Sequence, residues 1–106
     1  MAAIGGCVVL TPTSGTTVTV AIDISARLNL ATWTAGQTET VNISGIPSDG
    51  QELVFIITND TTSRTITMGV GLKALSTIAG VVNKKSTIRF IASGGIFYEN
   101  SRVVGL

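Results

Sequence analysis

Apolar and polar side chains alternate almost without interruption between residues 17 and 30. The apolar positions are Val18, Val20, Ile22, Ile24, Ala26, Leu28 and Leu30. A period of two is typical of a β-strand with one buried face, and these positions do not gather on one helical stripe. Strands usually run for about five or six residues. The segment therefore predicts two strands joined at a bulge or bend near residues 23–26.

The rest of the chain continues in the same way, with turn residues between short Val-, Ile- and Thr-rich runs. Pro47 to Gly50 and Gly94-Gly95 are strong turn signals. Residues 69–85 have the weakest periodicity and predict a long loop with one helical turn at 72–76. The further strands are predicted at 40–44, 53–57, 65–68, 87–91 and 96–99, of which 53–57 is apolar on both faces and should be a fully covered central strand.

Seven or eight short strands at this spacing predict an all-β fold. The expected architecture is a single antiparallel β-sandwich or jelly roll. The length of 106 residues allows one domain with one core. We assign residues 16–106 to the sandwich and residues 1–15 to an N-terminal arm or a first strand.

The composition favours a protein that works within a larger assembly. Only 12% of the residues are charged, against about 25% in an average soluble domain, and the mean hydropathy is +0.51. A small domain with so little charge leaves apolar surface exposed, which normally marks a contact with another protein. The alternative is a monomer with a neutral, Thr-rich surface. Lys84-Lys85 is the only adjacent pair of cations, so nucleic-acid binding is not predicted.

The residue types needed for common catalytic and metal sites are missing from the sequence. There is no His and only one Cys, which argues against Ser-His-Asp triads and thiolate or imidazole metal sites. Asp49 and Glu52 form the nearest carboxylate pair, but they flank a turn. We therefore predict no enzyme activity, no cofactor and no metal. Cys7 lies in an apolar run and is expected to be a small buried hydrophobe. No basic residue precedes Arg27 and no apolar run is long enough to span a bilayer, so neither a secretory signal nor membrane insertion is predicted.

Five residues are candidate contact positions. Trp33 is expected to pack in the core rather than to form a platform for a sugar, although a contact role stays open. Phe97 and Tyr98 should point to opposite faces of the last hairpin, so that one of them can reach an interface. Glu99 and Arg102, three residues apart, could form a charge-assisted hydrogen bond that holds the chain end. The alternative is a pair of solvated side chains that contributes little.

A set of motifs over residues 16–102 resembles small jelly-roll domains of tailed-bacteriophage virion proteins. Those domains occur in head-decoration and head-fibre proteins and at the tips of tail fibres. The matching elements, in order, are Asp49-Gly50-Gln51, Arg64-Thr65-Ile66-Thr67-Met68-Gly69, Thr87-Ile88-Arg89-Phe90-Ile91, Gly94-Gly95, Phe97-Tyr98-Glu99 and Ser101-Arg102. Phe97 stands where the family commonly has Trp.

The resemblance implies a homotrimer in a virion, made in the host cytoplasm. The chain has no fibre shaft, which favours a capsid decoration (cement) protein on the capsid exterior that binds the major capsid protein or another virion protein. Residues 1–10 would then reach a neighbour or the shell. The alternative is a receptor-binding module of a tail-fibre tip that recognises a host surface glycan through Trp33, Tyr98 or loop residues.

Overall fold

The computed structural model describes residues 6–13 and 15–106 and contains ten β-strands in these ranges. The strands are β1 (Cys7–Leu10), β2 (Thr17–Ala21), β3 (Leu28–Ala35), β4 (Glu39–Ser44), β5 (Glu52–Asn59), β6 (Thr65–Met68), β7 (Leu72–Lys73), β8 (Ile78–Ala79), β9 (Lys85–Ser93) and β10 (Ile96–Val103). They form a β-solenoid of about four turns in which the strands are mostly parallel.

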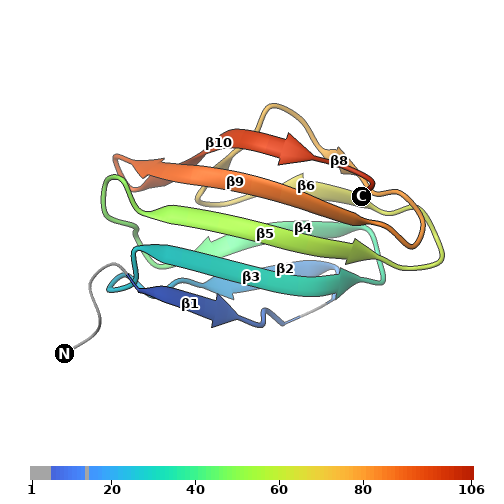
Figure 1. Cartoon of the computed structure of the whole chain (residues 1–106), viewed down its shortest axis with the longest axis horizontal. Coiled ribbons are helices and arrows are strands. Elements are labelled where there is room, and N and C mark those ends of the chain that lie inside the picture. Colours follow the sequence, from blue (N-terminus) through green and yellow to red (C-terminus); the bar gives the residue numbers. More distant parts are fainter. Residues whose placement is uncertain (1–5, 14) are drawn as a thin grey trace.

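The chain passes from one sheet to the other and back along each turn. The large sheet has the strand order β1-β3-β5-β9-β10-β7, and the small sheet has the order β2-β4-β6-β8. Figure 1 shows β1, β3, β5 and β9 side by side, with β2, β4 and β6 in a second layer behind them. The pairs β1–β3, β3–β5, β2–β4 and β4–β6 are parallel. Each of these four parallel pairs is therefore connected through one strand of the other sheet.

The predicted antiparallel sandwich or jelly roll is wrong, although the all-β class is right. Antiparallel pairs occur at β5–β9, β9–β10 and β6–β8, where the winding reverses. The prediction of two strands in the run at 17–30, joined near residues 23–26, is confirmed, and these strands, β2 and β3, belong to different sheets. Residues 69–85 hold the short strands β7 and β8, and the predicted helical turn at 72–76 is not formed.

The core lies between the two sheets and is built from inward-facing side chains of both. Trp33 and Phe55 meet edge to face at 5.2 Å between ring centroids, and Phe55 and Phe90 do so at 5.4 Å. Phe55 and Phe90 are both fully buried in this core. β5 is central, as predicted, but only its inner face is covered, because Val54 and Ile56 on its outer face are only half-buried.

Buried side-chain amides organise the loops that join the two sheets. Asn29 accepts a hydrogen bond from the Asp23 N–H (2.8 Å) and donates to the Asp23 carbonyl (3.1 Å). Asn59 donates to the carbonyls of Asp60 and Thr62 and accepts from the Arg64 N–H. Backbone groups that turn away from a sheet lose their ladder partners, and these amides replace them.

Cys7 is exposed, which corrects the prediction that it is buried. It lies in β1, at the edge of the large sheet, where only β3 pairs with the strand. Residues 1–5 of the predicted arm lie outside the described residues, so contact of that segment with a neighbour stays a prediction. The described residues contain no helix that could span a membrane.

Candidate interaction face

The outer face of the large sheet carries an apolar cluster that we call the apolar face. Strand alternation turns these side chains away from the core, because their neighbours along each strand are turned inward. The register places them in rows across neighbouring strands. The apolar face consists of Cys7, Val9, Leu28, Leu30, Val54 and Ile56.

One row runs straight across three strands. Val9 of β1 lies beside Leu30 of β3, which lies beside Val54 of β5. Val9 is 64% exposed, although it is flanked by apolar neighbours. Farther along the same sheet, Ile91 and Tyr98 lie opposite each other and are 37% and 48% exposed. Apolar side chains thus reach the surface on both sides of the sheet's centre.

A single ion pair lies next to the apolar face. Glu52 of β5 accepts a hydrogen bond from the Arg89 guanidinium of β9. The Arg89 side chain is 49% exposed, so solvent screens this pair and its contribution to stability is under about 1 kcal/mol. The two opposite charges neutralise each other locally. The face therefore presents no uncompensated charge at its centre that would repel a second apolar surface.

The outer face of the small sheet has a different character. Its outward side chains are short, polar and uncharged, apart from two alanines. In register, Thr17 lies beside Thr40, which lies beside Thr67. Such a face is well hydrated, and only its small methyl groups are apolar, so it has little apolar area to remove from water. Of the two outer sheet faces, the large sheet's is the one that gains from contact with a protein.

The five candidate contact residues are divided between the core and the surface. Phe97 is fully buried and Tyr98 is exposed, as predicted for opposite faces of the hairpin. Trp33 is buried in the core, and its indole N–H donates to Glu39 Oε1 at 2.8 Å. Phe97 and Trp33 thus do not reach the described surface, whereas Tyr98 does.

Glu99 and Arg102 form the predicted ion pair, with two hydrogen bonds of 2.8 and 2.6 Å. Their side chains are only 3% and 20% exposed. The pair does not hold the chain end, which is instead paired through the backbone of Leu106 and Lys85. It holds the loop between β7 and β8: Arg102 donates to the carbonyls of Ser76 and Thr77 at 2.9 and 3.0 Å. The Leu75 N–H also donates to Glu99 Oε1, at 3.1 Å.

Glu39 is a buried carboxylate that the sequence pattern does not reveal. Its side chain is 1% exposed, Oε1 accepts the Trp33 bond, and Oε2 has no partner among the described residues. Burial raises the pKa of Glu39 above its ordinary value of 4.5, because an ionised carboxylate loses its hydration; the Trp33 hydrogen bond and the Arg64 charge oppose this shift. Buried carboxylates with a raised pKa can be candidates for catalysis, but this one is enclosed in the core and is out of reach of a substrate.

We expect Glu39 to make the stability of the protein depend on pH. Its folded pKa lies above its unfolded pKa, so its contribution is fully present below the unfolded pKa and is lost as the pH rises through the folded pKa. Glu39→Gln has no carboxyl group to ionise, so it does not suffer this loss. Its free energy of unfolding should therefore rise relative to that of the wild type as the pH increases above about 4.3. Urea denaturation between pH 4 and 8 measures the difference, with Glu52→Gln, at a half-buried and ion-paired glutamate, as the control. A difference between wild type and Glu39→Gln that is constant over this range would contradict the assignment.

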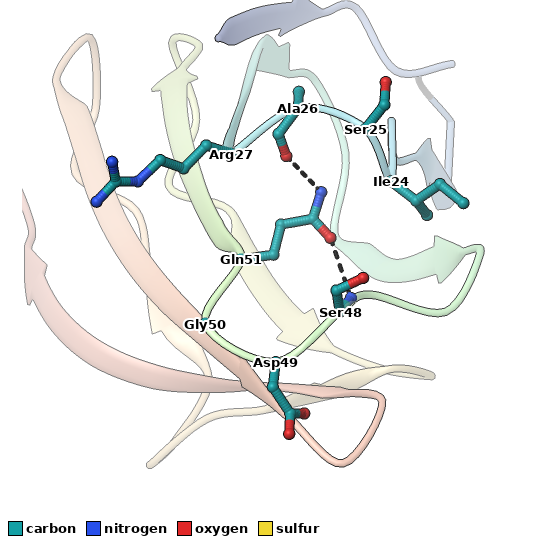
Figure 2. A pocket seen from close by; sticks show the side chains of 8 residues that line it. All are labelled: Ile24, Ser25, Ala26, Arg27, Ser48, Asp49, Gly50 and Gln51. Carbon is teal, nitrogen blue, oxygen red and sulfur yellow. Dashed lines mark hydrogen bonds between the residues drawn. The ribbon is translucent and has the colours of Figure 1, made fainter. Parts of the chain in front are cut away.

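An open hollow of about 430 Å³ lies where two loops meet at one end of the molecule. Figure 2 shows the residues that line it: Ile24, Ser25, Ala26, Arg27, Ser48, Asp49, Gly50 and Gln51. The Gln51 amide donates to the carbonyls of Asp23 and Ala26, both at 2.7 Å, and accepts from the Ser48 N–H at 3.2 Å. The buried Gln51 side chain is thus occupied in joining the two loops, and neither of its N–H groups is free for a ligand.

Comparisons with known proteins leave the family of the chain open. No family model matches the sequence, and no curated protein matches it. Within residues 6–13 and 15–106, no three His, Cys, Asp or Glu side chains lie together as a metal site would require. The apolar face is therefore the surface on which a function can be argued. Its outward residues Leu28, Leu30, Val54 and Ile56 were visible in the sequence only as members of strands, because alternation does not tell which face is covered.

Proposed function

We propose that the protein is a non-catalytic structural module that assembles with copies of itself through the apolar face. The observation that carries this proposal is the contrast between the two outer sheet faces. Removing exposed apolar area from water is the main favourable contribution to most protein association, and the large sheet offers more such area than the small sheet's Thr-rich face. The adjacent opposite charges of Glu52 and Arg89 favour a second copy as the partner, since each charge can meet its opposite in a neighbouring face.

The proposed setting is the capsid exterior of a tailed bacteriophage, where the assembled copies would act as a cement protein. This setting and the number of three copies rest on the resemblance of residues 16–102 to phage virion domains, and the jelly-roll fold that the resemblance implied is not the fold of this chain. A cement protein binds the assembled shell and not its separate subunits. It therefore stabilises the shell, and the stabilisation increases with the occupancy of its binding sites and with its affinity for them.

Lysines introduced on the apolar face should prevent self-association. We expect wild-type protein at micromolar concentration to have three times the 10.9 kDa mass of the chain by light scattering. The double variant Val54→Lys, Ile56→Lys should have the mass of one chain, because each copy would bring two desolvated charges to the contact. Thr65→Lys with Thr67→Lys is the matched control: it places two lysines at the same spacing on the small sheet and should leave the mass unchanged. A monomeric wild type would contradict the proposal.

The same variants test the virion setting on heads that lack the protein. Added wild-type protein and the Thr65→Lys, Thr67→Lys control should raise the temperature at which the heads release DNA, and the apolar-face variant should raise it much less. A deletion phage should adsorb to cells normally. Intact heat resistance together with lost adsorption would instead place the protein at a tail tip, and it would overturn the cement setting without affecting the assembly result.

A further inference from the structure

The described residues form four sheet edges, and three of them are protected from further pairing. Unpaired strand edges are templates for another strand, and natural proteins block them with very short strands, loops or charges. The edge strands β7 and β8 have two residues each. The outer edge of β2 is met by Thr13, which forms a bridge with Thr19. The fourth edge is β1, a four-residue strand at the margin of the large sheet in Figure 1, and no described residue pairs with its outer side.

The sequence of β1 is unusual for an edge strand. Cys7-Val8-Val9-Leu10 is apolar on both faces, a pattern typical of strands whose two faces are covered. Edge strands more often carry Lys or another charge, yet the first charged residue of the chain is Asp23. Val8 and Leu10, which face the core side, are only half-buried. The side chains of a further apolar strand beside β1 would contact those of β1 laterally on both faces and reduce their exposure.

The backbone of β1 has hydrogen-bonding groups available for that strand. The Leu28 N–H of β3 donates to the Gly6 carbonyl at 3.2 Å, so the backbone groups of Gly6 point toward β3. Backbone groups alternate in direction along a strand, which places those of Val8 on the same side as those of Gly6. The N–H and C=O groups of Cys7 and Val9 consequently point to the open edge.

We propose that β1 pairs with β1 of a second copy, antiparallel about a twofold axis at Val8. This register places Cys7 of one copy opposite Val9 of the other and uses all four outward N–H and C=O groups of each strand. A twofold contact requires a surface that complements itself. β1 meets this requirement because every side chain of the pair meets an apolar side chain. The contact lies at the sheet edge, so the inference goes beyond the proposed assembly through the apolar face.

The register makes a direct prediction for disulfide trapping. Val8 of the two copies would form a non-hydrogen-bonded pair with Cα atoms about 4.5 Å apart, within the range for a disulfide of roughly 4.4–6.8 Å. The natural Cys7 would lie diagonal to its mate, at about 7–8 Å, and outside that range. We expect the variant Cys7→Ser, Val8→Cys to form covalent dimers under mild oxidation at least tenfold faster than wild type, at concentrations of hundreds of micromolar, because so small a contact is weak.

Two further substitutions separate edge pairing from random collision. Val9→Pro removes an N–H that the fold does not use and should slow cross-linking of the Val8→Cys protein at least tenfold. Val9→Thr keeps the N–H and the branched shape, and should cross-link as before. Val9→Lys leaves the backbone intact and should also block pairing, which covers the case in which proline impairs folding.

Adding Val54→Lys and Ile56→Lys to the Val8→Cys protein should leave the cross-linking rate unchanged. This variant tests β1 pairing separately from assembly through the apolar face, so either proposal can fail without the other. Equal cross-linking of Val8→Cys and wild type, or cross-linking that none of the Val9 substitutions slows, would overturn the pairing.

Discussion

Arg102→Ala should lower the melting temperature by on the order of 10–20 °C. The substitution leaves the Glu99 carboxylate, with a side chain only 3% exposed, without its main partner. It also frees the loop carbonyls of Ser76 and Thr77. Removing one member of a largely buried ion pair costs about 3 kcal/mol or more, and 1 kcal/mol corresponds to roughly 4–8 °C in a domain of this size class. Thermal unfolding followed by circular dichroism measures the shift.

Arg89→Ala is the matched control, since Arg89 is paired with Glu52 but half-exposed. Its loss should cost under about 1 kcal/mol. Arg102→Lys should fall between the two variants, because a lysine cannot form the two parallel bonds to Glu99. Equal shifts for Arg102→Ala and Arg89→Ala would mean that the Glu99 pair contributes no more than a solvated one.

The Glu99 pair should also have a definite pH dependence. The Arg102 hydrogen bonds lower the pKa of Glu99 in the folded protein. The pair's contribution is therefore present above the unfolded pKa, about 4.3 for glutamate, and is lost as the pH falls through the lowered folded value. This is opposite in sign to the behaviour of Glu39, so the two residues can be distinguished by titration of stability.

The sequence predicted most strands but not how they pair. The alternation at Val18 and Val20, and at Leu28 and Leu30, indicates which side chains of one strand share a face. The same alternation results whether the next strand pairs beside the first or lies in the opposite sheet. A repeat of fixed length would have indicated a solenoid. Here Cys7 lies beside Leu28, but Leu28 lies beside Glu52, so successive turns differ in length and no period is visible.

The candidate residues were predicted best where the interaction is local in the sequence. Glu99 and Arg102 are three positions apart, and Phe97 and Tyr98 are adjacent on one strand, so alternation and spacing sufficed. Cys7 was misjudged because an apolar run predicts burial only if a neighbour covers both of its faces. The carboxylate of Glu39 was not singled out by the sequence. Glu39 lies in β4 of the small sheet and is buried because β4 packs against the large sheet, which contains β3, and its neighbours in the sequence do not reveal this packing.

Gly80→Ala should destabilise the protein by about 3 kcal/mol. A Cβ at position 80 would overlap the Asn59 Oδ1 atom and would lie 2.9 Å from Asn59 Cγ and 3.1 Å from the Arg64 carbonyl oxygen. The Asn59 amide cannot move aside without losing its hydrogen bonds to Asp60, Thr62 and Arg64. Overpacking alone costs about 1–3 kcal/mol, and each lost hydrogen bond about 1 kcal/mol.

Two controls test whether the clash with Asn59 is the cause. One is alanine at Gly36, and the other is Gly80→Ala in a protein that also carries Asn59→Ala. At Gly36 the nearest atom to a new Cβ is Asp60 Oδ2, at 3.9 Å, so Gly36→Ala should change the free energy of unfolding by no more than about 0.5 kcal/mol. Asn59→Ala is itself destabilising, but it removes the overlapping amide, so Gly80→Ala should cost much less in that background than in the wild type. Urea denaturation of the four proteins of this cycle measures the coupling. If the two substitutions are additive, the clash with Asn59 is not the cause, and the contact of the new Cβ with the Arg64 carbonyl oxygen, at 3.1 Å, accounts for the loss of stability instead.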